Sequence, residues 1–434
     1  MKFDTNMTML RKIIISFLVI LTTCGLGLAQ TYSDIIREYR YAAAGVYHPY
    51  HAGDLTDSKA PRGFKPFYIS HFGRHGSRYL AHPESYEPLY DGAGKVADLL
   101  SEEGGKIVEQ ALQVADAHKG MYGELTPLGA REHYAIAQRM YNRFPSVFRS
   151  RQEVECCAST VRRCIISMAN FAQGMDDCDP DLDFVFNTGD RYMAYIMKGN
   201  THKEIKSYVR SHLGPLKRER CGYEKLFSRL FTDPEEAAAR LGDPYKFALA
   251  LYDAAAIAPD LDFLGVDLLQ YFDIDELIAL AECDSDDMFA EVANSEEWGD
   301  FAMSPADDLL EDFIAKADAA ILPDSGRAAD LRFGHDTGLL PLTCLLGIRE
   351  MSVKYPSETA HDNWNTYSRI PMGSNLQMVF YRNAAGKILV KLLYNEKETG
   401  IPAIEPYSGN YYEWETLRAW MASRVEFARA NLKK

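Results

Sequence analysis

The sequence predicts an α/β protein with a mixed central sheet flanked by helices and an inserted, mostly helical smaller domain. Between residues 179 and 305 the chain is rich in Ala, Leu, Asp and Glu at helical spacing and shows no comparable strand pattern. Near the C-terminus, apolar residues alternate from Leu376 to Leu392 about an Asn-Ala-Ala-Gly turn, as in a β-hairpin. Three other segments share one pattern, an apolar strand followed by a turn or helix start with polar or charged residues: 67–78, 154–171 and 329–346.

The order of these patterns divides the chain into three parts. Residues 1–29 begin basic, continue apolar and end in small residues, which is the composition of a secretory signal peptide, so we expect export to the periplasm or the medium. The residue before Cys24 fits a lipoprotein anchor poorly. We expect the α/β core to comprise residues 30–178 and 306–434, and residues 179–305 to form a helical insertion over the site. No segment after the leader is long and apolar enough to span a membrane.

The chain is acidic, with a formal net charge of −15. Residues 1–29 contain three basic residues and one acidic residue, so the charge without them is −17. This charge disfavours nucleic acid as a partner, and local arginine clusters are informative because they stand against the overall field. Seven cysteines follow the leader, and Cys156 and Cys157 are adjacent in an expected strand, which does not indicate a full disulfide framework. The sequence sets no oligomeric state.

The first elements follow from short local signals. Phe67–Ile69 is an apolar run that predicts a buried strand before the turn at His71–Arg78. Further along, Thr126 is expected to be the N-cap of a helix, with Pro127 at the first helical position. A second buried strand is expected at residues 154–158.

The later elements are predicted in the same way. Ser159 and Thr160 are expected to cap a helix that runs to Phe171, and Ser304 to cap another. The acidic run 284–287 is interpreted as a solvated surface rather than a metal site. Pro341 is expected in the first turn of the last helix predicted here, where proline is tolerated. The remaining elements are a strand at 329–333 and helices at 234–241, 244–258, 274–282, 305–320 and 339–346.

The chemistry of the chain concentrates in the turn after the first strand. Arg74 and Arg78 flank His75 there, with glycines beside them. Arginine suits bidentate binding of phosphate oxygens, and such a set of residues could not be buried without an anionic partner. We therefore expect an anion at this turn, with the imidazole of His75 placed to attack it or to donate a proton to it.

Two simpler interpretations compete with an anion site. Arg-His-Gly is a common tripeptide, so the turn could be a solvated basic loop. His71 and His75 are four residues apart, which on a helix would present two zinc ligands on one face. Gly73 between them and the strand just before them argue against a helix at this position.

The other two segments with the strand–turn pattern add charged residues of the same kind. Arg162 and Arg163 lie just inside the helix after the second strand, and His335 and Asp336 follow the strand at 329–333. In an open α/β sheet, ligands bind beyond the carboxyl ends of the strands, where helix N-termini point at an anion. Together with the first turn, these residues predict a cationic phosphate pocket with a candidate nucleophile and one carboxyl group. No glycine-rich nucleotide loop or metal-ligand cluster of convincing spacing accompanies them.

These residues resemble the signatures of the histidine acid phosphatases, in the branch of the histidine phosphatase superfamily that includes phytases and multiple inositol polyphosphate phosphatases. The run Arg74-His75-Gly76-Ser77-Arg78 is similar to the first signature, and His335-Asp336-Thr337 to the second. The resemblance spans residues 40–400, with the helical insertion loosely matched, and implies a phosphoglycerate mutase-like sheet. The family's helix start and third arginine fall on Leu125-Thr126 with Gly129, and on Arg163 with Phe171.

The resemblance implies a role for each matched residue. His75 would attack phosphorus and carry a phosphohistidine, and nearby arginines should lower its pKa and keep it neutral. Asp336 would protonate the leaving alcohol and then help to deprotonate the attacking water, which requires it to start protonated and predicts an acidic optimum. The substrate would be a small-molecule phosphate monoester, and neither a cofactor nor a metal is implied. The residues that would hold the phosphoryl oxygens are Arg74, Arg78, Arg163 and His335.

Three neighbours of the matched residues are interpreted as structural. Arg162 is expected on the protein surface because Arg163 is the better match. His71 is expected to be structural or to lie at the rim of the pocket, and His133 to be packed or exposed on its helix.

The second signature of this chain differs from that of one subgroup of the family, which narrows the choice of subgroup. Multiple inositol polyphosphate phosphatases have His-Ala-Glu at the second signature, whereas His335-Asp336 looks more like the acid phosphatase and classical phytase pattern. Inositol polyphosphates, sugar phosphates and other monoesters all stay open as substrates. A mutase-like transfer is disfavoured by the expected export and by Asp336.

Two other classes of function are kept as alternatives. One is a catalytically silent protein that binds a phosphate ligand on the same fold, against which the intact His75 and Asp336 argue. The other is a metal-dependent hydrolase that would use His71, His75, His335 and Asp336.

Overall fold

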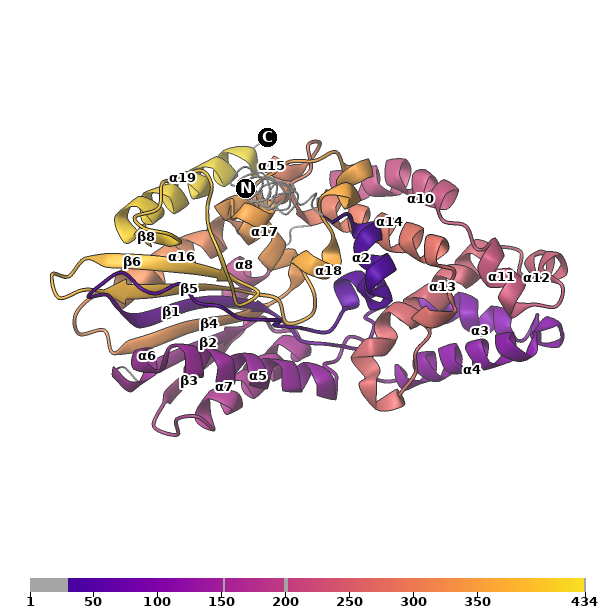
Figure 1. The fold of residues 1–434 in the computed structure, drawn as a ribbon, viewed down its shortest axis with the longest axis horizontal. Helices are drawn as coiled ribbons and strands as arrows, with labels where there is room; N and C mark the ends of the chain where they lie inside the picture. The colour runs from indigo at the N-terminus through magenta and orange to yellow at the C-terminus, as the bar shows by residue number, and fades with distance from the viewer. Residues whose placement is uncertain (1–29, 151–152, 199–201, 433–434) are drawn as a thin grey trace, which may run out of the picture.

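The computed structural model describes residues 30–150, 153–198 and 202–432, so the expected signal peptide lies outside the described residues. The chain forms an α/β part built on one sheet and, beside it, a layer made of helices (Figure 1). The predicted mixed sheet flanked by helices is confirmed. Among the described helices, none is long and apolar enough to cross a bilayer.

The sheet has eight strands in the order β3-β2-β4-β1-β5-β6-β7, with β8 paired to β6. Strands β1 to β4 pair in parallel, and β5 turns antiparallel to β1 and continues into a hairpin with β6. The strands predicted at 67–69, 154–158 and 329–333 and the predicted hairpin are all present. The strand bounds are β1 (Lys65–Arg74), β2 (Glu153–Ala158), β3 (Asp183–Thr188), β4 (Arg327–Gly334), β5 (Asn375–Arg382), β6 (Ile388–Tyr394), β7 (Lys397–Thr399) and β8 (Tyr411–Glu413).

Helices cover both faces of this sheet (Figure 1). Two buried apolar clusters fill the space between the helices and the two faces, which is the expected core arrangement of an α/β protein. One face is covered by α5 (Pro127–Arg143), α6 (Pro145–Ser150) and α7 (Arg162–Asp176). The other is covered by α16 (Asp307–Ala320), α17 (Asp336–Leu346) and α19 (Trp414–Leu432), with α8 (Asp190–Ile196) beside α16.

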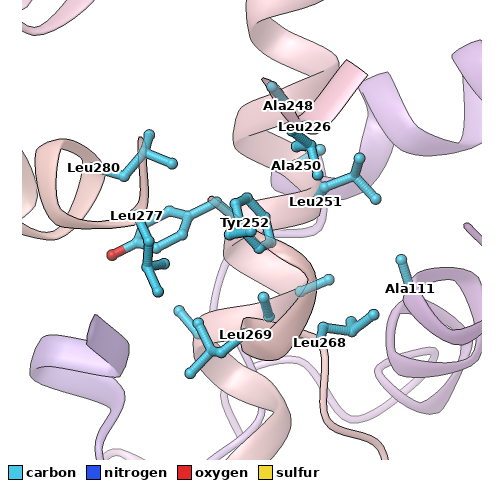
Figure 2. Packing of buried hydrophobic residues seen from close by; sticks show 14 of the residues in the cluster. Ala111, Leu226, Ala248, Ala250, Leu251, Tyr252, Leu268, Leu269, Leu277 and Leu280 are labelled. Carbon is cyan, nitrogen blue, oxygen red and sulfur yellow. The ribbon is translucent and has the colours of Figure 1, made fainter. Parts of the chain in front are cut away.

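The helical layer has a hydrophobic core of its own (Figure 2). Its central helix α13 is buried on nearly all sides, which explains why its sequence is apolar rather than amphipathic. The Tyr252 hydroxyl on α13 donates to the Ala43 carbonyl at 2.9 Å, so a hydrogen bond also links this core to the N-terminal segment. The helices of the layer are α2 (Tyr32–Glu38), α3 (Glu87–Ala93), α4 (Glu102–Ala117), α9 (Lys203–Tyr208), α10 (Gly214–Arg220), α11 (Glu224–Leu230), α12 (Pro234–Leu241), α13 (Pro244–Ile257) and α14 (Ile274–Val292).

Short helical turns connect the two parts of the molecule. Those used below are η1 (Arg40–Tyr47) and η5 (Ala258–Leu264), and two further short helices are α15 (Gly299–Ala302) and α18 (Thr366–Arg369). Buried residues of the N-terminal segment and of residues 79–115 pack in the same cluster as residues 221–283. The helical layer is therefore assembled from chain on both sides of β1 together with part of the segment 179–305. The division of the chain at 178 and 305 stays a prediction.

The absence of strands expected within 179–305 is wrong, because β3 lies there and pairs with β2 along its whole length. β3 is the edge strand of the sheet, and most of its side chains are exposed or half-buried. It follows α7 after a short loop and precedes a long helical run. A short edge strand next to that run carries too little buried apolar pattern to stand out in the sequence.

Several expected helix starts differ from the structure. The N-cap Thr126 is confirmed, since its Oγ1 accepts from the Gly129 amide at 3.2 Å. Ser159 and Thr160 do not cap α7, which begins after Val161 without a side-chain cap. Ser304 does not cap α16, because a short turn over residues 304–306 comes first. All three hydroxyls lie close to a helix start, but none of them bonds to the first free amides of α7 or α16.

Two helices are longer than predicted. α14 continues to Val292 and includes the acidic run 284–287. Asp286 in that run is buried and accepts from the main-chain amide of His361 at 2.9 Å, so the interpretation as a solvated surface is wrong for this residue. α17 begins at Asp336, which places Pro341 inside the helix rather than in its first turn. The seven cysteines of the described chain are all free.

Candidate active site

Two histidines meet at the carboxyl ends of neighbouring parallel strands. β1 and β4 pair with Arg74 opposite Gly334, so the next residues, His75 and His335, leave the sheet side by side. The His75 amide donates to the Gly334 carbonyl at 2.9 Å, and the two imidazole ring centres lie 5.5 Å apart. The register of one strand pair therefore brings together two residues that are 260 positions apart in sequence.

The third predicted segment reaches the same place from β2. Arg163, in the first turn of α7, lies with Nη2 at 3.3 Å from Nδ1 of His335 and donates through Nη1 to the Gly123 carbonyl at 3.2 Å. Arg162 turns away to pair with Glu124, and its side chain is 79% exposed. The expectation that Arg162 is a surface residue agrees with this position.

Arg74 is a fully buried cation at the centre of the site. Its Nη1 donates to the carbonyls of Val46 at 2.8 Å and Ile370 at 2.7 Å, and its Nη2 lies 2.9 Å from Oδ2 of Asp336. Asp336 is the first residue of α17 and accepts from the Thr337 amide through Oδ1 at 2.8 Å. A buried charge is costly unless it is paired, and here one carboxylate and two carbonyl oxygens compensate it.

The three predicted arginines carry donors that the protein does not use. The guanidinium of Arg78 lies over the ring of Tyr47, 5.3 Å from its centre, and donates to the Tyr79 carbonyl at 3.0 Å. The buried Nε atoms of Arg74, Arg78 and Arg163 have no hydrogen-bond partner among the described residues. Buried donors are nearly always paired in proteins, so unused donors on three converging cations favour an anionic ligand at this place.

The environment of His75 keeps its imidazole neutral. Burial lowers the pKa of His75 well below its ordinary value, and the positive charges of Arg163 and Arg74 lower it further. The expected direction is right, although burial is a larger cause than the arginines. His75 Nδ1 lies 2.9 Å from the Gly76 carbonyl, which can only accept, so we assign the proton to Nδ1. This tautomer leaves the lone pair on Nε2, as a nucleophile requires.

His335 is likewise neutral. Burial first, and then the charge of Arg163, lower the pKa of His335 to about 4. Arg163 can only donate, so Nδ1 of His335 accepts, and its Nε2–H faces the Ser159 hydroxyl at 3.1 Å. The ring of His335 is therefore held between Arg163 and Ser159, with its one N–H donor at Nε2.

Asp336 differs from its predicted starting state. Burial raises the pKa of Asp336, but the positive charge of Arg74, with smaller contributions from Arg78 and the Thr337 amide, outweighs burial and holds the pKa below its usual value. Without a bound phosphate, this environment therefore favours the ionised carboxylate, whereas the family resemblance implied that Asp336 starts protonated. The cause is the Arg74 guanidinium 2.9 Å away, a contact that no local sequence pattern reveals.

His71 does not belong to the group of residues around His75 and His335. It is buried in the core, where its ring lies 5.4 Å from that of Phe171 and 5.6 Å from that of Phe333. It is therefore a structural residue and not a rim residue. Within the described residues, no group of three or more His, Cys, Asp or Glu side chains could hold a metal ion. The metal-dependent alternative required His71 beside His75 and His335, and this arrangement is not found.

A buried carboxylate that the sequence analysis missed holds the turn in place. Glu132 on α5 accepts from the amide of Ser77 at 2.7 Å, from the Ser77 hydroxyl at 2.9 Å and from the Tyr50 amide at 2.7 Å. Its neighbour His133 lies with Nε2 at 3.0 Å from the Arg74 carbonyl, so it is packed and hydrogen-bonded. Glu132 and Ser77 are 55 positions apart, so no local pattern in the sequence indicated this contact.

Helix α5 and the turn approach each other without room for side chains. A Cβ on Gly129 would lie 2.2 Å from the Ser77 carbonyl oxygen, and a Cβ on Gly76 would lie 2.5 Å from that of Gly129. The Ser77 carbonyl accepts from both the amide and the hydroxyl of Thr126, at 2.9 and 3.0 Å. Both glycines are therefore required by a close approach of backbone to backbone.

The family profile described as histidine phosphatase superfamily (branch 2) matches residues 73–209 and 291–395, more than half of the chain. The chain belongs to this superfamily. The matched region of this histidine phosphatase contains all six predicted site residues, and the gap in the match falls within the predicted helical insertion.

Solved structures with the same fold include inositol phosphate phosphatases. The Bifidobacterium longum multiple inositol polyphosphate phosphatase in complex with inositol hexasulfate matches with a TM-score of 0.74 at 21% identity, covering 88% of this chain and 98% of that one. The phytase from D. castellii matches with a TM-score of 0.65 at 15% identity, covering 93% and 89%. At these identities the likeness shows the fold alone. No curated protein matches the sequence.

The close approach of α5 predicts the effect of adding one methyl group. We expect Gly129→Ala to push the Ser77 carbonyl away, to lower the free energy of unfolding by about 1–3 kcal/mol through overpacking, and to reduce phosphatase activity by roughly 10²-fold through misplaced catalytic groups. Thermal unfolding and steady-state kinetics measure the two effects.

The matched control is Gly105→Ala in α4, where a Cβ meets no atom within 4 Å. Alanine is the better helix former, so this variant should gain about 0.5–1 kcal/mol with unchanged activity. Equal behaviour of the two variants would contradict the backbone contact at Gly129.

Proposed function

We propose that this histidine phosphatase hydrolyses phosphate monoesters through a phosphohistidine on His75. The observation that carries the proposal is the convergence of a neutral imidazole with three arginines whose buried Nε donors are unused. His75 Nε2 holds the lone pair and attacks phosphorus, and the bond from phosphorus to the ester oxygen breaks. Arg74, Arg78, Arg163 and His335 bind the phosphoryl oxygens and stabilise the charge that develops on them, and for this the Nε2–H of His335 exchanges the Ser159 hydroxyl for a phosphoryl oxygen.

Asp336 supplies the proton in this mechanism, and its pairing with Arg74 explains when it gains that proton. A phosphate dianion bound to Arg74 competes with Asp336 for the guanidinium and places negative charge beside the carboxyl group. Both effects raise the pKa of Asp336, so substrate binding and proton uptake are coupled. The protonated carboxyl then donates to the leaving oxygen, and the resulting carboxylate takes a proton from the water that hydrolyses the phosphohistidine.

The substrate class we propose is small phosphate monoesters, among them inositol phosphates. The Bifidobacterium longum structure that shares this fold is described as a multiple inositol polyphosphate phosphatase and holds inositol hexasulfate. The aspartate after His335 supports an acid phosphatase or phytase pattern instead of the His-Ala-Glu of that group. The basic and apolar leader over residues 1–29 supports export to the periplasm or the medium.

Turnover without metal is the first test. With excess chelator at mildly acidic pH, the protein should release phosphate from phytate and from an aryl phosphate, and His75→Ala should abolish both activities because the nucleophile is gone. Colorimetric phosphate release measures this. Activity that returns only with zinc or another divalent ion would contradict the mechanism, and silence under both conditions would support a binding protein.

The proton donor predicts a dependence on pH and on the leaving group. His75 stays neutral in acid because its pKa is well below the ordinary value, whereas Asp336 loses its proton as the pH rises, so activity should be maximal in acid and fall towards neutrality. Asp336→Asn should reduce hydrolysis of alkyl phosphates by about 10²–10⁴-fold. The aryl phosphate should be affected much less, because its leaving group needs little protonation.

Rates for the alkyl and aryl substrates across a pH series measure this prediction. A maximum above neutrality, or an equal loss on both substrates, would remove Asp336 from the proton-donor role.

Two neighbouring arginines provide a matched pair of variants. Arg163→Ala removes a buried donor beside His335 and should reduce kcat/KM by roughly 10²–10³-fold, as expected for loss of one transition-state donor. Arg162→Ala removes an exposed ion pair and should stay within about twofold of the unchanged protein. Equal effects on steady-state kinetics would show that Arg163 acts through helix stability instead of phosphate binding.

A further inference from the structure

A carboxyl group from the helical layer reaches the turn that carries Arg78. Asp260 lies in η5, directly after α13, and its side chain is completely buried. Its Oδ2 accepts a hydrogen bond from the main-chain amide of Arg78 at 3.0 Å, and its Oδ1 has no partner in the described part of the chain. The bond joins residues 182 positions apart, so it links the helical layer directly to the candidate active site.

Asp260 completes a pair of carboxyl groups that hold two consecutive amides. Glu132 on α5 accepts from the Ser77 amide at 2.7 Å, and Asp260 accepts from the next amide, that of Arg78. Buried amides rarely give up such partners because leaving them unpaired costs free energy. The backbone at Arg78 is therefore held from the sheet side by α5 and from the other side by η5.

The side chain of Arg78 depends on this backbone for its direction. Its guanidinium lies over Tyr47 and donates to the Tyr79 carbonyl, and its buried Nε is unused. No carboxylate lies within ion-pair distance of it among the described residues. Since few side-chain contacts orient Arg78, the two fixed amides before and at this residue set where its guanidinium points.

We propose that Asp260 is a positioning residue that fixes Arg78 for phosphate binding, so that the helical layer supplies part of the catalytic turn's support. This inference rests on the proposed function, in which Arg78 binds the phosphoryl group of the substrate. Among the described residues, the hydrogen bond of the Asp260 side chain goes to the main-chain amide of Arg78 and not to a guanidinium group or an imidazole. Asp260 acts through the main chain of Arg78.

The charge state of Asp260 suits this role. Burial raises the pKa of Asp260 well above its ordinary value, the nearby Glu132 raises it further, and the Arg78 amide and the Ser77 hydroxyl only partly oppose the rise. A protonated carboxyl still accepts one hydrogen bond through its carbonyl oxygen. It also adds no negative charge next to Arg74 and Arg78, which leaves their attraction for phosphate intact.

If Asp260 acts as a hydrogen-bond acceptor, two substitutions of similar size should differ in their effect on activity. Asp260→Asn keeps a carbonyl oxygen and no charge, whereas Asp260→Leu has no acceptor. We expect the leucine variant to lose about 10–100-fold in kcat/KM on an aryl phosphate, and the asparagine variant to stay within about threefold. The Ki of inorganic phosphate should rise with the loss in the leucine variant, because both ligands use Arg78.

The matched control lies two residues away. Asp262 is on the same turn but is exposed and pairs with Arg131 on the surface, so Asp262→Leu and Asp262→Asn should behave like the unchanged protein. Circular dichroism and thermal unfolding establish that each variant is folded. Asp260→Ala is measured beside the leucine variant, since it removes the acceptor without adding apolar bulk.

The outcomes are distinguishable from failure of the proposed function. If the unchanged protein turns over and Asp260→Leu and Asp260→Ala match it, the positioning role is wrong. If Asp260→Asn falls as far as Asp260→Leu, the acceptor role is also wrong. If the unchanged protein shows no turnover, the proposed function fails. The shift of the unfolding temperature by inorganic phosphate then tests positioning alone, and an equal shift in the unchanged and leucine proteins overturns it.

Discussion

The burial of the Arg74 guanidinium constrains everything around it. A cation with no exposed surface is tolerated only where anionic or carbonyl oxygens surround it, and Arg74 collects such oxygens from three separate segments. Val46 lies in η1, Ile370 precedes β5, and Asp336 begins α17. Through these contacts, Arg74 at the end of β1 connects η1, the segment before β5 and the start of α17.

This constraint explains why the site is cationic in an acidic protein. The chain carries a net charge of −15, yet Arg74, Arg78 and Arg163 converge on His75. The carboxyl groups close to them do not simply cancel their charge. Asp336 is ionised against Arg74, whereas burial raises the pKa of both Glu132 and Asp260. In Glu132 and Asp260, burial therefore opposes ionisation, and this limits the negative charge beside the positive potential that a phosphate ester requires.

Local patterns were sufficient where neighbouring residues form the structure. The run at 67–69, the Thr126 cap and the Asn-Ala-Ala-Gly hairpin turn each act over a few residues, and each is present as predicted. Ser159 shows where this reasoning fails. A hydroxyl before a helix is an ordinary N-cap, but Ser159 instead lies 3.1 Å from Nε2 of His335, a residue 176 positions away. The competing partner follows another strand, β4, so a local pattern around Ser159 gives no sign of it.

The sequence by itself determined the mixed α/β class, the family resemblance and the identities of the six candidate site residues, because each rests on short runs at the ends of apolar strands. Tertiary structure alone decided how these residues meet and in which protonation states. The register of β1 on β4 places His75 beside His335, and the Arg74 contact makes Asp336 ionised. Glu132 and Asp260 were found only in the folded chain, since their bonds to the turn span 55 and 182 residues and depend on packing that no local periodicity encodes.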